Sequence, residues 1–161
     1  MQAKNIGTEK GWQKIKHYCG YQERSHAETR DKLYSYGLYK HEVETLLSQL
    51  IEENYLNEER YALSFVGGHF RTKHWGPVKI KYALSQKKVS PYNIKKALQS
   101  IGEAEYLAAA EKLAVTKFSL LASEKNMLTK KSKLQNFLLQ KGYEYSQVST
   151  LINKLLASEN R

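Results

Sequence analysis

Cysteine and proline are scarce in this chain, and it has no long apolar run. A single cysteine, Cys19, excludes an intramolecular disulfide framework, and its place on an apolar helix face favours a buried side chain over a nucleophile. Pro77 and Pro91 both fit the first turn of a helix. No apolar run reaches the length of a membrane span and nothing resembles a signal peptide, so we expect a cytoplasmic protein without membrane contact.

Acidic residues are absent between Arg60 and Gly102, where 9 basic residues lie. Residues 1–59 hold 8 basic and 10 acidic residues and residues 103–161 hold 9 and 6, so most of the net charge of +10 comes from the middle of the chain. Ordinary surfaces mix both signs. One-sided charge predicts a surface that attracts phosphate or an acidic protein groove, with a merely solvated basic surface as the alternative. The predicted binding residues are Arg71, Lys73, Lys79, Lys81, Lys87, Lys88, Lys95 and Lys96.

Residue patterns for catalysis or metal binding are also missing. The five histidines show no metal-ligand spacing, and His69 and His74, five residues apart, do not share a helix face as an i, i+4 pair would. The glycines near these histidines lack the Lys-Ser or Lys-Thr pair of a phosphate-binding loop. We therefore predict no enzyme activity, no catalytic residue, no metal and no cofactor.

An apolar pattern returns three times along the chain. Its first column is Leu33, Leu84 and Leu138, and a turn column of Gly37, Lys88 and Gly142 follows four residues later. Four further apolar columns, spaced three, one and three residues apart, indicate a helix face turned toward a core. They begin at Val43, Ile94 and Val148. Each copy therefore predicts a helix, a turn and a second helix, and Lys88 must either take the left-handed conformation that suits glycine or end its helix by another turn.

A further helical stretch precedes each pair, and no strand alternation is found. The fold class predicted is all-α, an elongated tandem array of three three-helix, helix-turn-helix-like repeats, with modules at residues 1–56, 57–102 and 103–161. The polar, basic segment Ser119 to Lys133 is expected to form a loop. Gly67 and Gly68 lie inside a helical run, which indicates a close helix approach or a bend.

Helix starts and core aromatics can also be predicted. Ser25 to Glu28 fits a capping box, and Ser90 before Pro91 fits a helix cap. Asn57 is predicted to cap the helix that follows it. The aromatic residues Tyr18, Tyr61, Phe65, Phe70 and Tyr82 lie at core-like spacing, so we expect core packing rather than stacking on bases.

Short motifs in order along residues 12 to 156 resemble the RecX family of regulatory proteins. Arg24, Ser25, Glu28 and Gly37 are similar to its "R-x-S-x-x-E-L-x-x-K-L-x-x-x-G" opening. The middle is similar to its "L-x-D-E-R-[FY]-A … G-P-x-[KR]-I-x-x-x-L-x-x-K-G-[IV]" core at Arg60, Tyr61, Gly76, Pro77 and Ile80, although Lys88 replaces the turn glycine. Gly142 matches the "L-x-x-[KR]-G-[FY]" ending.

This resemblance implies a protein that lies in the helical groove of the RecA recombinase filament and contacts DNA or neighbouring protomers. The resemblance also implies inhibition of ATP hydrolysis, recombinase and coprotease activities in DNA repair and SOS control. We expect a monomer whose contact with single- or double-stranded DNA is weak and non-specific. The paired helices leave a second reading open, in which a helix-turn-helix protein binds DNA directly and acts without RecA.

Overall fold

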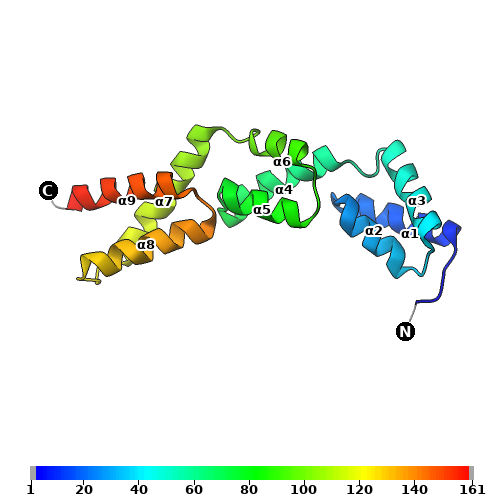
Figure 1. The fold of residues 1–161 in the computed structure, drawn as a ribbon, viewed down its shortest axis with the longest axis horizontal. Coiled ribbons are helices and arrows are strands. Elements are labelled where there is room, and N and C mark those ends of the chain that lie inside the picture. The colour runs from blue at the N-terminus through cyan, green and yellow to red at the C-terminus, as the bar shows by residue number, and fades with distance from the viewer. Residues whose placement is uncertain (1–2, 160–161) are drawn as a thin grey trace. The chain divides into compact units, whose positions relative to one another are not determined.

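The computed structural model describes residues 3–159, which form nine α-helices and no strand (Figure 1). By its internal contacts the chain divides into two compact units. The first unit runs to Phe65 and includes Leu84–Ala97, and the second holds Val66–Ala83 and the described residues from Leu98 onward. The all-α prediction is confirmed, whereas the division into three modules stays a prediction. The helices are α1 (Thr8–Tyr21), α2 (His26–Ser35), α3 (Lys40–Glu52), α4 (Glu58–Lys73), α5 (Pro77–Gln86), α6 (Pro91–Leu98), α7 (Glu103–Leu120), α8 (Met127–Lys141) and α9 (Tyr145–Glu159).

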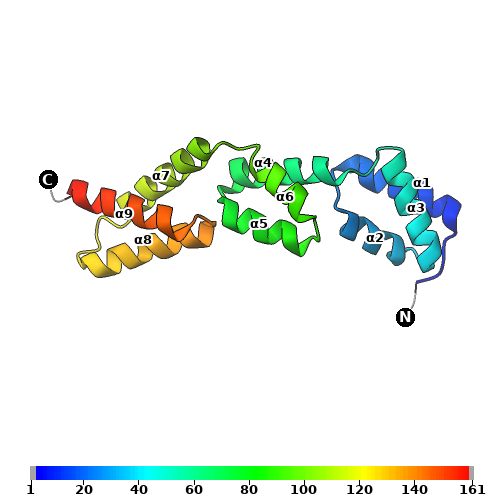
Figure 2. The ribbon, with the colours of Figure 1, turned by 45° about the horizontal axis from the view of Figure 1, so that its top comes forward.

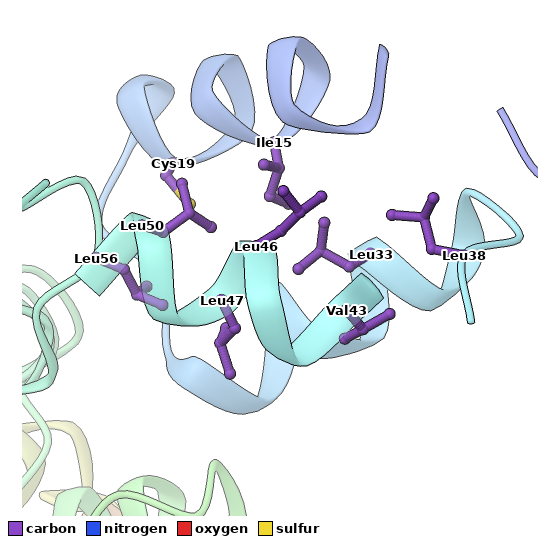
Figure 3. Packing of buried hydrophobic residues seen from close by; sticks show 9 residues of the cluster. All are labelled: Ile15, Cys19, Leu33, Leu38, Val43, Leu46, Leu47, Leu50 and Leu56. Atoms are coloured by element: carbon purple, nitrogen blue, oxygen red, sulfur yellow. The ribbon is translucent and has the colours of Figure 1, made fainter. Parts of the chain in front are cut away.

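The core of the first unit lies where α1, α2 and α3 pack against one another (Figure 3). Ile15, Leu33 and Leu50, one from each helix, have no exposed surface. Because these helices are short, most of their stability comes from burying this shared apolar face rather than from helix propensity. Cys19 lies in the same core, as expected, and burial raises the pKa of its thiol. The other core members are Leu38, Val43, Leu46, Leu47 and Leu56.

In the second unit α7, α8 and α9 pack against one another, as the two ribbon views show (Figures 1 and 2). Ala110 and Ala114 of α7 are fully buried, and their small side chains allow the neighbouring helices to approach α7 closely. Leu134 and Leu138 of α8 are equally buried. The first apolar column of the repeat is therefore buried in all three copies, since Leu33 and Leu84 have no exposed surface either.

The turn column adopts the left-handed conformation in every copy. Gly37 has φ 78°, Lys88 has φ 60° and Gly142 has φ 99°. The first of the two alternatives for Lys88 is therefore the correct one. A lysine in this region is strained because its Cβ crowds the backbone, at a cost of about 1 kcal/mol.

Lys88→Gly is expected to raise the free energy of unfolding by about 0.5–1 kcal/mol in urea denaturation, since glycine relieves this strain. Lys87→Gly is the matched control, because it removes the same charge from the neighbouring position, whose φ is not positive. The control should be neutral or destabilising. Equal stability of the two variants would show that Lys88 carries no strain.

The predicted helix starts are confirmed. The Ser25 hydroxyl accepts a hydrogen bond from the Glu28 amide at 3.1 Å, and the Glu28 carboxylate accepts one from the Ser25 amide at 2.8 Å. Asn57 accepts from the Arg60 amide at 2.9 Å, and Ser90 from the Asn93 amide at 3.3 Å. Pro77 and Pro91 are the first residues of α5 and α6. These side chains satisfy amides that have no partner within their helices.

Two expectations are wrong, the loop at Ser119 to Lys133 and the core position of Tyr82. Most of Ser119 to Lys133 is helical, because Asn126 caps α8 by accepting from the amides of Leu128 and Thr129. Lys130, expected in a loop, is only 3% exposed and pairs with Glu159 at 2.8 Å.

Of the two alternatives for Gly67 and Gly68, the close helix approach is excluded, because Gly68 has open space where a Cβ would lie and a Cβ on Gly67 would meet only the end of the Arg71 side chain. The bend stays a prediction. Tyr82 is 67% exposed, whereas Tyr61 and Phe70 are buried and Tyr18 and Phe65 are half-buried. Helical spacing alone did not identify the outward face of α5.

Candidate binding surface

The eight predicted basic residues fall into two groups, one in each unit. Arg71 and Lys73 end α4, and Lys79 and Lys81 begin α5, in the second unit. Lys87 and Lys88 form the turn before α6 and Lys95 and Lys96 end it, in the first unit. All are exposed except Lys79, which is half-buried. Solvent-accessible ammonium and guanidinium groups can contact phosphate or carboxylate without first breaking a core.

In the second-unit group, the side chains of Lys73, Lys79 and His69 lie against the ring of Trp75. Lys79 Nζ lies 4.5 Å and Lys73 Nζ 5.4 Å from its ring centre, and the His69 ring centre lies 4.7 Å away. The Lys141 ammonium donates to the Lys73 carbonyl at 3.3 Å. Cation–π contact holds lysine ends that would otherwise move freely. The Trp75 cluster, defined as His69, Lys73, Trp75, Lys79 and Lys141, is thus a fixed cationic patch.

The Trp75 cluster is fixed by a backbone joint to the end of α8. The Gly76 amide donates to the Lys141 carbonyl at 2.7 Å, and the Val78 amide donates to the Gly142 carbonyl at 2.9 Å. A Cβ on Gly76 would lie 2.5 Å from the Gly142 oxygen. Gly76 and Gly142 are therefore required for this contact, while Pro77 begins α5 and Ile80 is fully buried. Burial raises the pKa of the neighbouring Tyr143 to about 12.

The first-unit group lies close to carboxylates. Lys87 and Lys88 line a hollow of about 200 Å³ together with Glu28 and Asp31 of α2. Lys96 forms an ion pair with Glu59 at 2.8 Å, and this hydrogen bond raises the pKa of Lys96. The field of this group is therefore weaker than its count of lysines suggests.

Arg60, which belongs to the basic run by composition, is neutralised by an upstream acid. Its Nε donates to the Glu23 carboxylate at 2.5 Å, and its two terminal nitrogens reach Asn54 Oδ1 and the Asn54 carbonyl, both at 3.2 Å. It thus fixes the α1–α2 link, through Glu23, and the α3–α4 link, through Asn54, to the start of α4. Tyr61 beside it is buried, which raises its pKa, and the nearby Glu28 charge raises it further.

Sequence reasoning missed Trp75 and Lys141 as members of the cationic patch. Trp75 stands directly before Gly76-Pro77 and between Lys73 and Lys79, so an aromatic ring amid lysines was the available signal. Lys141 had no such signal, because only the folded chain brings α8 beside the α4–α5 turn.

The described part of the chain contains no group of three metal-ligating side chains. No helix within residues 3–159 is both long and apolar enough to cross a bilayer.

These features define a class, an all-α helical-repeat protein with exposed basic groups. The family model described as "RecX, second three-helix domain" matches residues 57–98, and "RecX, third three-helix domain" matches residues 103–152. The chain belongs to the RecX family of regulatory proteins.

Named relatives and solved structures agree with this assignment. Regulatory protein RecX of Clostridium perfringens is 34% identical over 137 residues, covering 84% of this chain and 64% of the relative. That of Streptococcus uberis is 29% identical over 139 residues, covering 86% and 53%. The chain thus spans between about half and two thirds of the length of these relatives. The crystal structure of RecX from Lactobacillus salivarius superposes with a TM-score of 0.81 at 28% identity, covering 92% of this chain and 96% of that one.

Proposed function

We propose that this protein binds the RecA nucleoprotein filament and restrains it, lowering its ATPase, recombinase and coprotease activities in DNA repair and SOS control. It acts by occupancy in the cytoplasm, as a monomer and without chemistry of its own. The observation that carries the proposal is the absence of any acidic residue from Arg60 to Gly102, a stretch that largely coincides with the second RecX domain at residues 57–98.

Electrostatics supports a polyanionic partner. Arg71, Lys73 and Lys81 are exposed on the second unit, and the Trp75 cluster adds two further lysines at fixed positions. A nucleoprotein filament offers phosphates in a repeating groove. Fixed lysines release condensed counterions on contact with phosphate, so binding should weaken steeply with salt.

Reversing charge at Lys79, Lys81 and Lys87 to glutamate is expected to weaken inhibition of RecA-driven ATP hydrolysis roughly tenfold, because each change removes one phosphate contact and adds a repulsion. The assay follows ATP hydrolysis by RecA on single-stranded DNA while the regulator is titrated. The matched control reverses Lys112, Lys125 and Lys131, which are exposed on the second unit and lie outside the basic segment, here defined as Arg60 to Gly102.

Both triple variants carry the same net charge, so the control should inhibit almost like the parent. Circular dichroism and thermal unfolding verify that the helices persist. Inhibition unchanged by the first variant would remove the basic segment from the mechanism. Tight, sequence-selective binding to a short duplex without RecA would instead favour the direct DNA-binding reading.

A further inference from the structure

A groove on the first unit gathers three tyrosines outside the basic segment. Tyr18 and Tyr21 come from α1 and Tyr36 from the end of α2, and the space they line measures about 490 Å³. We call this the tyrosine groove. Its volume falls in the range of sites that hold small organic ligands, about 300–1,000 Å³.

Every charged side chain that lines the tyrosine groove is basic. Lys14, Arg24 and Lys32 line it together with His17, and no carboxylate does so among the described residues. This selection runs against the composition of the segment, since residues 1–59 hold 10 acidic and only 8 basic residues. An anionic ligand in the groove would therefore be next to cations, while the carboxylates of Glu28 and Asp31, which act on Tyr18, do not line it.

The cations are held at defined places over the rings. The Arg24 guanidinium lies 3.8 Å from the Tyr18 ring centre, and its Nε donates to the Tyr18 carbonyl at 3.1 Å. Lys32 Nζ lies 5.5 Å from the same ring, and Lys14 Nζ lies 5.7 Å from the Tyr36 ring. A preorganised cation loses less conformational entropy on binding an anion than a free one does.

One ring of the groove is open to stacking. Tyr21 is 77% exposed at the last residue of α1, whereas Tyr18 and Tyr36 are half-buried. A tyrosine hydroxyl is neutral at physiological pH and does not repel a phosphate, and burial raises the pKa of Tyr18 and Tyr36 further from that range.

We propose that the tyrosine groove binds one nucleotide of a single-stranded nucleic acid, with the base on the Tyr21 ring and the flanking phosphates beside Lys14 and Lys32. A flat ring beside ammonium groups matches a base and its phosphates. A duplex keeps its bases stacked and cannot offer one to Tyr21, and an acidic peptide has no need of the ring. The inference goes beyond the proposed function, because it requires neither RecA nor residues 71–96.

Tyr21→Leu and Tyr21→Phe test the role of the ring at constant position and similar size. Fluorescence anisotropy with a labelled 12-nucleotide oligothymidylate, at low salt and without RecA, should show about tenfold weaker binding for Tyr21→Leu and near-parental binding for Tyr21→Phe. An abasic oligomer of equal length should bind the parent about as weakly as oligothymidylate binds Tyr21→Leu. Thermal unfolding verifies that both variants fold.

Photocrosslinking identifies the peptide of the protein that contacts the oligomer. An oligomer with one photoreactive thymine analogue, followed by trypsin, should label the peptide His17 to Arg24 in the parent and in the triple charge-reversal variant at Lys79, Lys81 and Lys87. This measurement does not involve RecA, so its result does not depend on whether the protein inhibits RecA. The proposed function and the tyrosine-groove proposal can therefore be refuted independently. Equal oligothymidylate affinity of Tyr21→Leu and the parent, equal affinity for the abasic oligomer, or equal competition by polyglutamate would overturn the inference.

Discussion

Gly142→Ala is expected to lower the free energy of unfolding by about 3 kcal/mol, through left-handed strain and a backbone clash together. At φ 99° an alanine is strained whatever the surrounding space. Its Cβ would also overlap the Cβ of Lys79 and lie 2.7 Å from the Lys79 amide nitrogen. The Lys79 backbone cannot move away from this Cβ, because the neighbouring Val78 amide donates a hydrogen bond to the Gly142 carbonyl at 2.9 Å. The joint between the α4–α5 turn and α8 must therefore open.

Gly68→Ala is the matched control for Gly142→Ala. The chemical change is the same, but Gly68 lies inside α4 with nothing within 4 Å of the added Cβ. Alanine there should stabilise by about 0.5–1 kcal/mol, since glycine weakens a helix interior. Urea denaturation of both variants measures the difference. A Gly142→Ala protein as stable as the parent would mean that the joint does not constrain the second unit.

Local features of this fold could be predicted from the sequence. The capping box at Ser25 and the left-handed turns at Gly37 and Gly142 act through residues within a few positions of one another. The apolar columns could be aligned because a helix buries one face at a fixed period. Residues such as Leu33 and Leu138 are fully buried as a result.

Features that depend on distant contacts could not be predicted. Gly76 directly precedes the helix start at Pro77, yet its lack of a side chain matters because the Gly142 carbonyl lies against it. Lys130 has the composition of a surface residue and is buried because Glu159 and the Phe118 ring, 4.3 Å away, accept its ammonium. Glu159 is 29 residues from Lys130, and Gly142 is far from Gly76 along the chain, so no short window along the chain contains both members of either contact.

Counting charges along the sequence identified the excess of basic residues from Arg60 to Gly102, but it could not identify which of them form ion pairs with carboxylates. Lys96 and Arg60 add to the count, although Glu59 and Glu23 neutralise them in the folded first unit. Lys141 does not belong to the segment, although it joins the Trp75 cluster. The sequence predicts that all the basic residues from Arg60 to Gly102 contribute equally to the positive charge available for binding. In the folded chain the Trp75 cluster contributes more of this charge than Lys96 or Arg60 does.

Arg60→Ala is expected to cost about 2 kcal/mol of unfolding free energy, a large effect for a side chain that is 39% exposed. The reason is geometric. One planar guanidinium reaches Glu23 at 2.5 Å and two Asn54 oxygens at 3.2 Å, and its second terminal nitrogen also lies 3.4 Å from the Tyr55 carbonyl. Removing it leaves the α1–α2 and α3–α4 links without their common partner. Water replaces some of these bonds, which keeps the cost below that of a buried pair.

Arg60→Lys and Arg71→Ala separate geometry from charge in this prediction. Lysine keeps the positive charge but has a single ammonium, which can contact Glu23 and cannot reach the Asn54 oxygens in the same pose, so it should recover less than half of the loss. Arg71→Ala makes the same truncation on the same helix at an exposed site and should change stability by no more than about 0.5 kcal/mol. Urea denaturation ranks the three variants. Full recovery by lysine would reduce the role of Arg60 to its charge alone, and a loss at Arg71 equal to that at Arg60 would mean that the contacts to Glu23 and Asn54 contribute nothing.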